Sequence, residues 1–171
     1  MRILWCVTGG GFMLEETCQA IAEIVKRHEV TLALSKAGEE VVWMYGKTNA
    51  LKKAVREIIH EEYQGASSPL VCKLGSFDLI VISPCTANTT AKIAYGIADS
   101  LVSNIAAQAL KTGKKVVAVP TDLEKNVDTM IPSGKKIKIQ CRKVDLENVK
   151  RLEDMENIVV VKKPMDVEKF V

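Results

Sequence analysis

The sequence is poor in aromatic residues and histidine, and its cysteines are not spaced to hold a metal. Its 171 residues include 5% aromatics, two histidines and five cysteines. No two cysteines lie closer together than 12 residues, as at Cys6 and Cys18, and no C-x-x-C motif occurs. This excludes a zinc ribbon or a ferredoxin-type cluster held by one loop. We therefore expect no metal site, and we expect reduced, buried thiols.

Long apolar runs and an excess of one charge are also absent. The apolar stretch at residues 79–82 is far too short to span a bilayer. The 24 Lys and Arg residues against 21 Asp and Glu leave a formal charge of +3 without a basic tail, which favours neither a membrane nor a nucleic-acid partner. Residues 1–7 lack the apolar core of a signal peptide. With 47% hydrophobic residues, the composition predicts one compact cytoplasmic domain.

Strand-like and helix-like segments alternate along the chain. A doubly wound, mostly parallel α/β sheet explains this alternation, because each crossover between parallel strands needs a helix. The functional site is then expected at the carboxyl ends of the strands. The expected strands are residues 2–8, 30–34, 77–82 and 115–120, and the expected helices are 14–27, an amphipathic segment bearing residues 51–59, and one or two helices within 87–110.

The pattern is less regular beyond Pro120. We interpret 1–171 as a single domain in which 121–171 forms a C-terminal extension rather than a second domain. Within the extension we expect a loop as far as Ser133-Gly134, followed by further elements. These are a short strand at 136–141, a charged helix near 145–155 and an apolar run at 158–161.

A glycine loop, Gly9-Gly10-Gly11, stands between the first strand and the first helix. Bare backbone N–H groups beside a helix N-terminus can approach and neutralise a phosphate. The loop is not a dinucleotide fingerprint, because Leu14 takes the place of the last glycine and Ser35, not an acidic residue, ends the second strand. The pattern favours a mononucleotide phosphate, with Ser35 as a hydroxyl donor.

The most specific feature is a polar cluster directly after the strand at 77–82. Thr86, Asn88 and Thr89 follow this strand, and a second polar pair lies at 99–100. Helix capping by one of these residues is the simplest alternative. Capping explains one polar side chain, whereas a ligand site explains the whole run.

These motifs resemble those of the homo-oligomeric flavin-containing cysteine decarboxylase family. That family carries Pro-x-Ser-Ala-Asn-Thr and Gly-x-Ala-Asp, and residues 84–89 and 96–99 here read Pro-Cys-Thr-Ala-Asn-Thr and Gly-Ile-Ala-Asp. The likeness extends over roughly residues 3–120. It implies a Rossmann-like fold of the flavodoxin type, bound FMN and a trimer-based homo-oligomer.

The resemblance also implies which residues surround the cofactor. The glycine loop and Ser35 would lie around the FMN phosphate, and the residues after the strand at 77–82 would lie near the phosphate, the ribityl chain or the ring. The last pair would lie near a subunit boundary. The implied set is Gly9, Gly10, Gly11, Ser35, Thr86, Ala87, Asn88, Thr89, Asp99 and Ser100.

Two family signatures of decarboxylation are missing. Decarboxylases carry a catalytic histidine before the strand that leads into the Asn motif, yet residues 64–83 contain none. His28 and His60 are expected at the ends of helices, in contact with solvent. The residues after Pro120 do not match the Pro-x-Met-Asn-x-x-Met-Trp clamp, and the Pro-Arg-Glu signature of flavin prenyltransferases is also absent. A divergent decarboxylase or prenyltransferase therefore remains the alternative function.

The C-terminal segment 132–141 and the charged helix after it are similar to the archaeoflavoprotein branch and the related dihydromethanopterin reductases. This resemblance implies an FMN-dependent flavoprotein that accepts electrons from reduced ferredoxin. The small-molecule acceptor is unidentified, with a pterin such as dihydromethanopterin as a candidate. The basic segment 135–143 is either a docking site for acidic ferredoxin or a strand edge protected by lysines.

Overall fold

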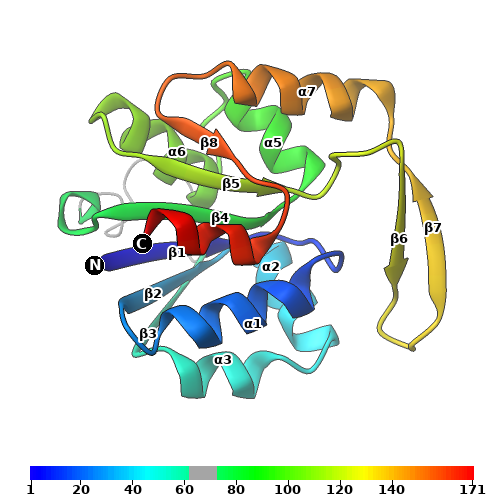
Figure 1. Cartoon of the computed structure of the whole chain (residues 1–171), viewed down its shortest axis with the longest axis horizontal. Helices are drawn as coiled ribbons and strands as arrows, with labels where there is room; N and C mark the ends of the chain where they lie inside the picture. The colour runs from blue at the N-terminus through cyan, green and yellow to red at the C-terminus, as the bar shows by residue number, and fades with distance from the viewer. Residues whose placement is uncertain (62–72) are drawn as a thin grey trace.

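The computed structural model describes residues 1–61 and 73–171 (Figure 1). Its main sheet has six parallel strands in the order β3-β2-β1-β4-β5-β8. They are β1 (Arg2–Val7), β2 (Glu29–Leu34), β3 (Glu57–His60), β4 (Leu79–Cys85), β5 (Val116–Pro120) and β8 (Ile158–Val160). The strand order reverses between β1 and β4, where a doubly wound sheet opens a crevice at its carboxyl edge. The predicted fold class is confirmed.

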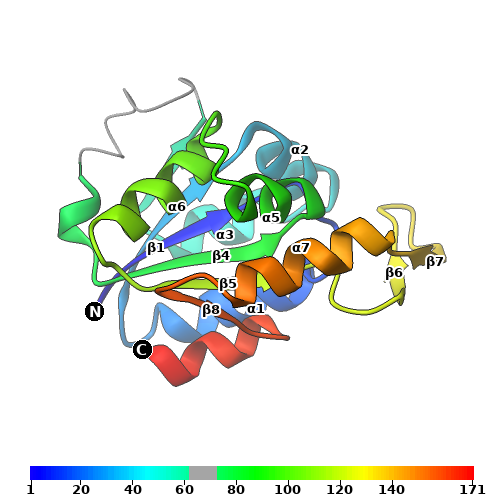
Figure 2. The same ribbon diagram turned by 90° about the horizontal axis from the view of Figure 1, so that it is seen from above.

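Helices cover both faces of this sheet, as the two perpendicular views show (Figure 2). One layer contains α1, with α3 and the C-terminal 3-10 helix η2 beside it, and the other contains α5, α6 and α7. The short helix α2 follows β2 and buries Val42 in the core of the first layer. The bounds are α1 (Leu14–Ile24), α2 (Lys36–Met44), α3 (Thr48–Ala54), η1 (Leu74–Ser76), α5 (Ala87–Ala94), α6 (Leu101–Lys111), α7 (Lys143–Glu153) and η2 (Pro164–Phe170).

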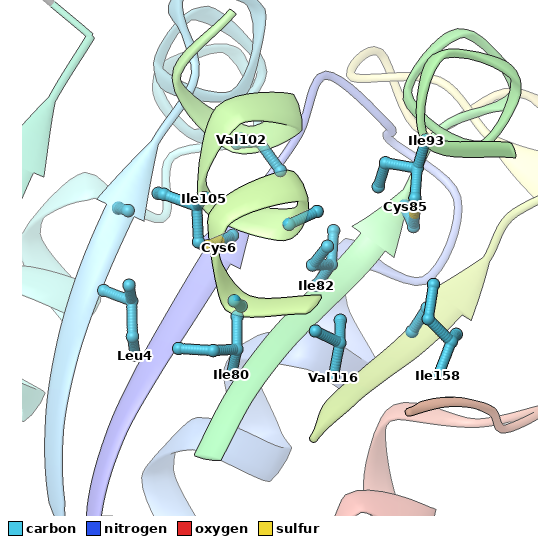
Figure 3. Packing of buried hydrophobic residues seen from close by; sticks show 14 of the residues in the cluster. Leu4, Cys6, Ile80, Ile82, Cys85, Ile93, Val102, Ile105, Val116 and Ile158 are labelled. Atoms are coloured by element: carbon cyan, nitrogen blue, oxygen red, sulfur yellow. The ribbon is translucent and has the colours of Figure 1, made fainter. Parts of the chain in front are cut away.

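The central strands are buried on both faces, which explains their continuous apolar runs. Successive side chains of a strand point to opposite faces. Trp5 and Val81 accordingly pack in the α1 layer. Leu4 and Ile80 point the other way, toward Ile105 of α6 (Figure 3).

A two-stranded antiparallel hairpin projects beyond the carboxyl edge of the main sheet (Figure 1). It consists of β6 (Asn126–Met130) and β7 (Lys136–Gln140), with Asp128 opposite Lys138. The strand expected at 136–141 is present as β7, but its partner β6 lies where we expected a loop. That prediction was wrong because β6 is mostly exposed, so its sequence has no continuous apolar run.

The helix expected to carry residues 51–59 ends early. Helix α3 stops at Ala54, and Ile58 and Ile59 belong to strand β3, paired with Leu32 and Ala33 of β2. β-branched side chains suit a pleated surface, and pairing with β2 outweighs the helical spacing of the apolar residues. His60 therefore ends an edge strand rather than a helix.

Part of the last fifty residues joins the main sheet and its core. Strand β8 pairs with β5, and Leu152 of α7 and Ile158 of β8 join the α6-side core. The helix expected near 145–155 is α7, whereas η2, which packs against α1, was not predicted. The division at residue 121 stays a prediction. Among the described residues, no helix has the length and apolar character needed to cross a membrane.

Candidate functional site

Thr8 ties the glycine loop to the start of α5 at the carboxyl edge of the sheet. Its Oγ1 donates a hydrogen bond of 2.7 Å to the carbonyl oxygen of Pro84, and it accepts one of 3.0 Å from the backbone N–H of Thr86. The hydroxyl of Thr86 in turn donates to Thr89 Oγ1 over 3.2 Å. Two of the predicted groups of site residues are thus held side by side.

Gly10 occupies a point where three loops converge. A Cβ atom there would lie 3.2 Å from Thr121 Cγ2, 3.3 Å from Thr86 Cγ2 and 3.5 Å from Pro84 Cβ. Pro84 lies near the end of β4 and Thr86 follows it, Thr121 follows β5, and Gly10 itself lies after β1. A residue without a side chain allows this close approach and leaves the backbone open to a ligand.

The N-terminus of α5 has the properties of an anion site. Its N-cap residue, Thr86, makes no side-chain capping bond, and the first turn contains no acidic residue. Backbone N–H groups at the start of a helix lack partners within the helix and carry a partial positive charge. The first turn of α5 is therefore suited to bind an anion, while the predicted contact of residues 86–89 with a phosphate stays a prediction.

The N-termini of α2 and α6 are closed from within the chain. Ser35 caps α2, because its Oγ accepts the backbone N–H of Gly38 over 2.9 Å. Ser100 caps α6 by a reciprocal capping box with Ser103. The hydroxyl hydrogen of Ser35 stays available for donation to a ligand. The predicted donor role of this residue is thus compatible with its capping role.

Asp99 and Ser100 are not brought into contact with the glycine loop. Asp99 is exposed and lies 2.7 Å from the ammonium of Lys92, a hydrogen bond that lowers the pKa of the carboxyl group. Within the described chain, the hydrogen bonds of this pair reach only residues 92–104. Their predicted place near a subunit boundary stays a prediction.

A cavity of about 860 Å³ lies between the glycine loop, the end of α2 and the hairpin. Phe12 and Met13 line it from the loop, and Tyr45 lines it from α2. The Tyr45 hydroxyl donates a 2.9 Å hydrogen bond to the carbonyl of Met130 on β6. This volume is in the range of cofactor sites, and its lining mixes apolar and polar groups.

The described cysteines have the character of core residues rather than reactive thiols. Burial raises the pKa of Cys85, inside the predicted motif, to about 12, and its Sγ lies 3.3 Å from Thr90 Oγ1. Burial also raises the pKa of Cys6 and brings that of Cys18 to about 11. Cys141 is also buried, and burial raises the pKa of its thiol to about 11. The fifth cysteine, Cys72, lies outside the described residues. No group of three potential metal ligands occurs in the described ranges.

Comparison with known proteins identifies the family. The family model described as Flavoprotein matches residues 1–170. The chain belongs to the Flavoprotein family. An uncharacterised protein of Methanocaldococcus jannaschii is 41% identical and covers 100% of this chain and 94% of its own length. A dihydromethanopterin reductase (acceptor) of the same organism is 32% identical, over 99% of this chain and 95% of its own.

A solved structure of this family shows the same fold. Burkholderia xenovorans DmrB, in complex with FMN and described as a cubic protein cage for redox transfer, superposes with a TM-score of 0.84. It is 30% identical and covers 99% of this chain and 92% of that chain. The predicted family and fold are confirmed, and the cofactor of this relative is the predicted one. The individual site residues stay predictions.

Sequence reasoning missed two residues that organise the site. Thr8 was considered only as the start of the glycine loop, although it joins the loop to α5. Glu61 was not considered, although its carboxylate is buried at the end of β3. The β-branched pair Ile58-Ile59 is the signal that would have found Glu61. If residues 57–60 are interpreted as a strand, the residue after them belongs at the functional edge of the sheet.

Proposed function

We propose that this chain binds FMN at the glycine loop and the start of α5, and that it is an oxidoreductase that moves electrons through this cofactor. The observation that carries the proposal is the open N-terminus of α5, held by Thr8 against the glycine loop. Membership of the Flavoprotein family and the FMN of the Burkholderia relative support the choice of cofactor.

The residues of the site fit a phosphate that is bound without arginine. The backbone N–H groups of Gly9, Gly11 and residues 87–89 supply donors, because those of Gly10 and Thr86 already bind Thr8. Ser35 and Thr89 add hydroxyl groups. The cavity beside the loop offers Phe12 and Met13 to a flat aromatic ring and limits its contact with water. FMN, when bound, supplies the one- and two-electron chemistry, so the protein's task is binding, orientation and access.

Reduced ferredoxin is the proposed electron donor, and a pterin such as dihydromethanopterin is the proposed type of acceptor. The name of the Methanocaldococcus jannaschii relative, dihydromethanopterin reductase (acceptor), which is similar over 99% of this chain, supports this type of acceptor. Lys136 and Lys138 support the donor, because both line the cavity from the hairpin and attract an acidic protein. A trimer-based homo-oligomer is part of the proposal, supported by the cage of the Burkholderia relative.

Cofactor binding is tested first. Purified protein is incubated with FMN, desalted, and examined by absorption spectroscopy and mass spectrometry of the released cofactor. We expect one FMN per chain. If the protein cannot be loaded with FMN, the proposed function is wrong.

Electron entry is tested on the loaded protein under anaerobic conditions. Reduced ferredoxin is mixed with it, and bleaching of the flavin absorption is followed with and without dihydromethanopterin. Carbon dioxide release from a peptidyl-cysteine is measured in parallel. Release of carbon dioxide without a response to ferredoxin would favour the decarboxylase function over ours.

The basic segment is tested by charge reversal. Replacing Lys135, Lys136 and Lys138 with glutamate is expected to slow reduction by ferredoxin at low salt, because electrostatic steering raises association rates. FMN content and reduction by dithionite, which need no docking protein, serve as controls. If the rate of reduction by ferredoxin at low salt is unchanged, the basic segment does not dock ferredoxin.

A further inference from the structure

The carboxylate of Glu61 is buried at the end of β3, with 9% of the residue exposed. Its Oε2 accepts the backbone N–H of Lys36 over 3.0 Å, and its Oε1 accepts that of Leu101 over 2.5 Å. These are the first residues of α2 and α6. A buried carboxylate is costly unless it is hydrogen-bonded, and the positive ends of two helices are favourable partners for it.

Glu61 also fixes both neighbours of Ser35. Its backbone N–H donates to the carbonyl of Leu34 over 3.1 Å, while its carboxylate holds the N–H of Lys36. Ser35 itself donates its backbone N–H to Val7 of the adjacent strand over 3.1 Å. The backbone on each side of Ser35 is therefore fixed, and with it the position of the Ser35 hydroxyl.

The same carboxylate affects where an anion can bind. The first N–H groups of α2 and α6 already have a negatively charged partner, so these termini do not attract a second anion. The first turn of α5 has no such partner among the described residues. Of these three helix N-termini, that of α5 therefore keeps N–H groups available for an anion. The hydroxyl of Ser35 is also available as a donor.

We propose that Glu61 is a positioning residue for FMN, and that it acts by holding Ser35 where its hydroxyl reaches the phosphate. This inference rests on the proposed function, because it assumes that FMN binds at this edge of the sheet. Loss of the carboxylate frees the first turn of α2 and weakens binding of the phosphate. The ring and ribityl chain are unaffected, because Glu61 makes no hydrogen bond to the residues that line the cavity beside the glycine loop.

The test compares FMN with riboflavin, which has the same ring and ribityl chain but no phosphate. Dissociation constants are measured by flavin fluorescence for the wild type and for Glu61→Ala and Glu61→Gln. We expect Glu61→Ala to weaken FMN about tenfold and riboflavin less than about twofold, since a charge-assisted hydrogen bond is strong. Glu61→Gln retains one acceptor and should show a smaller loss of FMN affinity.

The matched control is Glu57→Gln, which makes the same change at the start of the strand that Glu61 follows. Glu57 is exposed and begins β3, at the opposite edge of the sheet from Ser35. Its variant should bind both flavins as the wild type does. Thermal unfolding followed by circular dichroism shows whether each variant is folded, and Glu61→Gln provides the test if Glu61→Ala does not fold.

Combination with Ser35→Ala tests the route of the effect. If Glu61 acts through Ser35, Glu61→Gln changes FMN affinity little in the Ser35→Ala background. The inference is overturned by equal losses for FMN and riboflavin, by unchanged FMN affinity, or by a full effect of Glu61→Gln without Ser35. Failure of the wild type to bind FMN overturns the proposed function instead, which keeps the two failures distinguishable.

Discussion

Two kinds of helix N-terminus lie at the carboxyl edge of the sheet, and they differ in what satisfies them. The termini of α2 and α6 are closed by Ser35 and Ser100, and both also bind the carboxylate of Glu61. The terminus of α5 has neither a side-chain cap nor an acidic residue in its first turn. All three carry the same helix dipole. The difference shows that neighbouring side chains, rather than the helix itself, decide which terminus is open to a ligand.

The largest expected effect comes from placing a negative charge at the open terminus. Asn88→Asp adds a charge to the first turn of α5 with almost no change of shape. Like charges about 4 Å apart at a protein surface repel by about 4 kcal/mol, so we expect FMN to bind about a thousandfold more weakly. Riboflavin, which has no phosphate, should lose much less affinity. Both constants are measured by fluorescence titration.

The same substitution should leave stability equal or slightly higher, because acidic residues favour a helix N-terminus. Val144→Asp, in the first turn of α7, is the matched control and should not change FMN binding. If Asn88→Asp weakens FMN and riboflavin equally, the phosphate does not lie at this terminus.

An intermediate effect is expected from the link between the open terminus and β1. Thr8→Val keeps the shape of the side chain but removes the acceptor for the backbone N–H of Thr86. A buried donor without a partner costs about 2 kcal/mol, so the melting temperature should fall by about 6 °C. Differential scanning calorimetry measures this change.

Thr129→Val is the control for Thr8→Val. Thr129 lies half-buried on the hairpin, and its side chain makes no hydrogen bond within the described residues. Its variant should melt within about 1 °C of the wild type, as substitutions without such partners usually do. Equal melting temperatures for both variants would show that Thr8 is not essential to the loop.

The smallest effect is expected at a closed terminus. Ser103→Ala removes the oxygen that accepts the backbone N–H groups of Asp99 and Ser100 over 3.1 and 3.0 Å. Loss of a cap costs about 1 kcal/mol, which corresponds to about 3 °C in melting temperature. FMN affinity should not change. Ser35→Ala should lower the melting temperature by a similar amount and should also weaken FMN binding. If the two variants bind FMN equally well, Ser35 and Ser103 do not differ in their relation to the cofactor.

The sequence and the structure agree best where one signal dominates. The apolar run at 79–82 and the glycine loop are local patterns, and both were found with their correct roles in the sheet. Residues 57–60 and 126–130 were misassigned, because their pairing with β2 and β7 depends on partners that are remote or not apolar. Edge and hairpin strands lack the burial that makes a strand visible in a sequence.

The predicted site divides in the same way. Gly10 and Thr86 are neighbours in space, as the motifs implied, because parallel strands bring their carboxyl ends to one edge. Ser35 caps α2 and is also a candidate ligand of the phosphate. A serine at the end of a strand does not by itself predict the capping role. Nor could the role of Glu61, since no local pattern shows that its carboxylate is 9% exposed and bound to two helices.

The sequence by itself determined the alternation of the central strands with helices, the glycine loop and the polar residues after β4. It did so because apolar periodicity and residues without side chains act locally. The tertiary structure alone decided which helix N-termini are closed and which is open. That choice depends on Thr8, Glu61 and Pro84, whose contacts join segments 25 to 78 residues apart, and only folding brings them together.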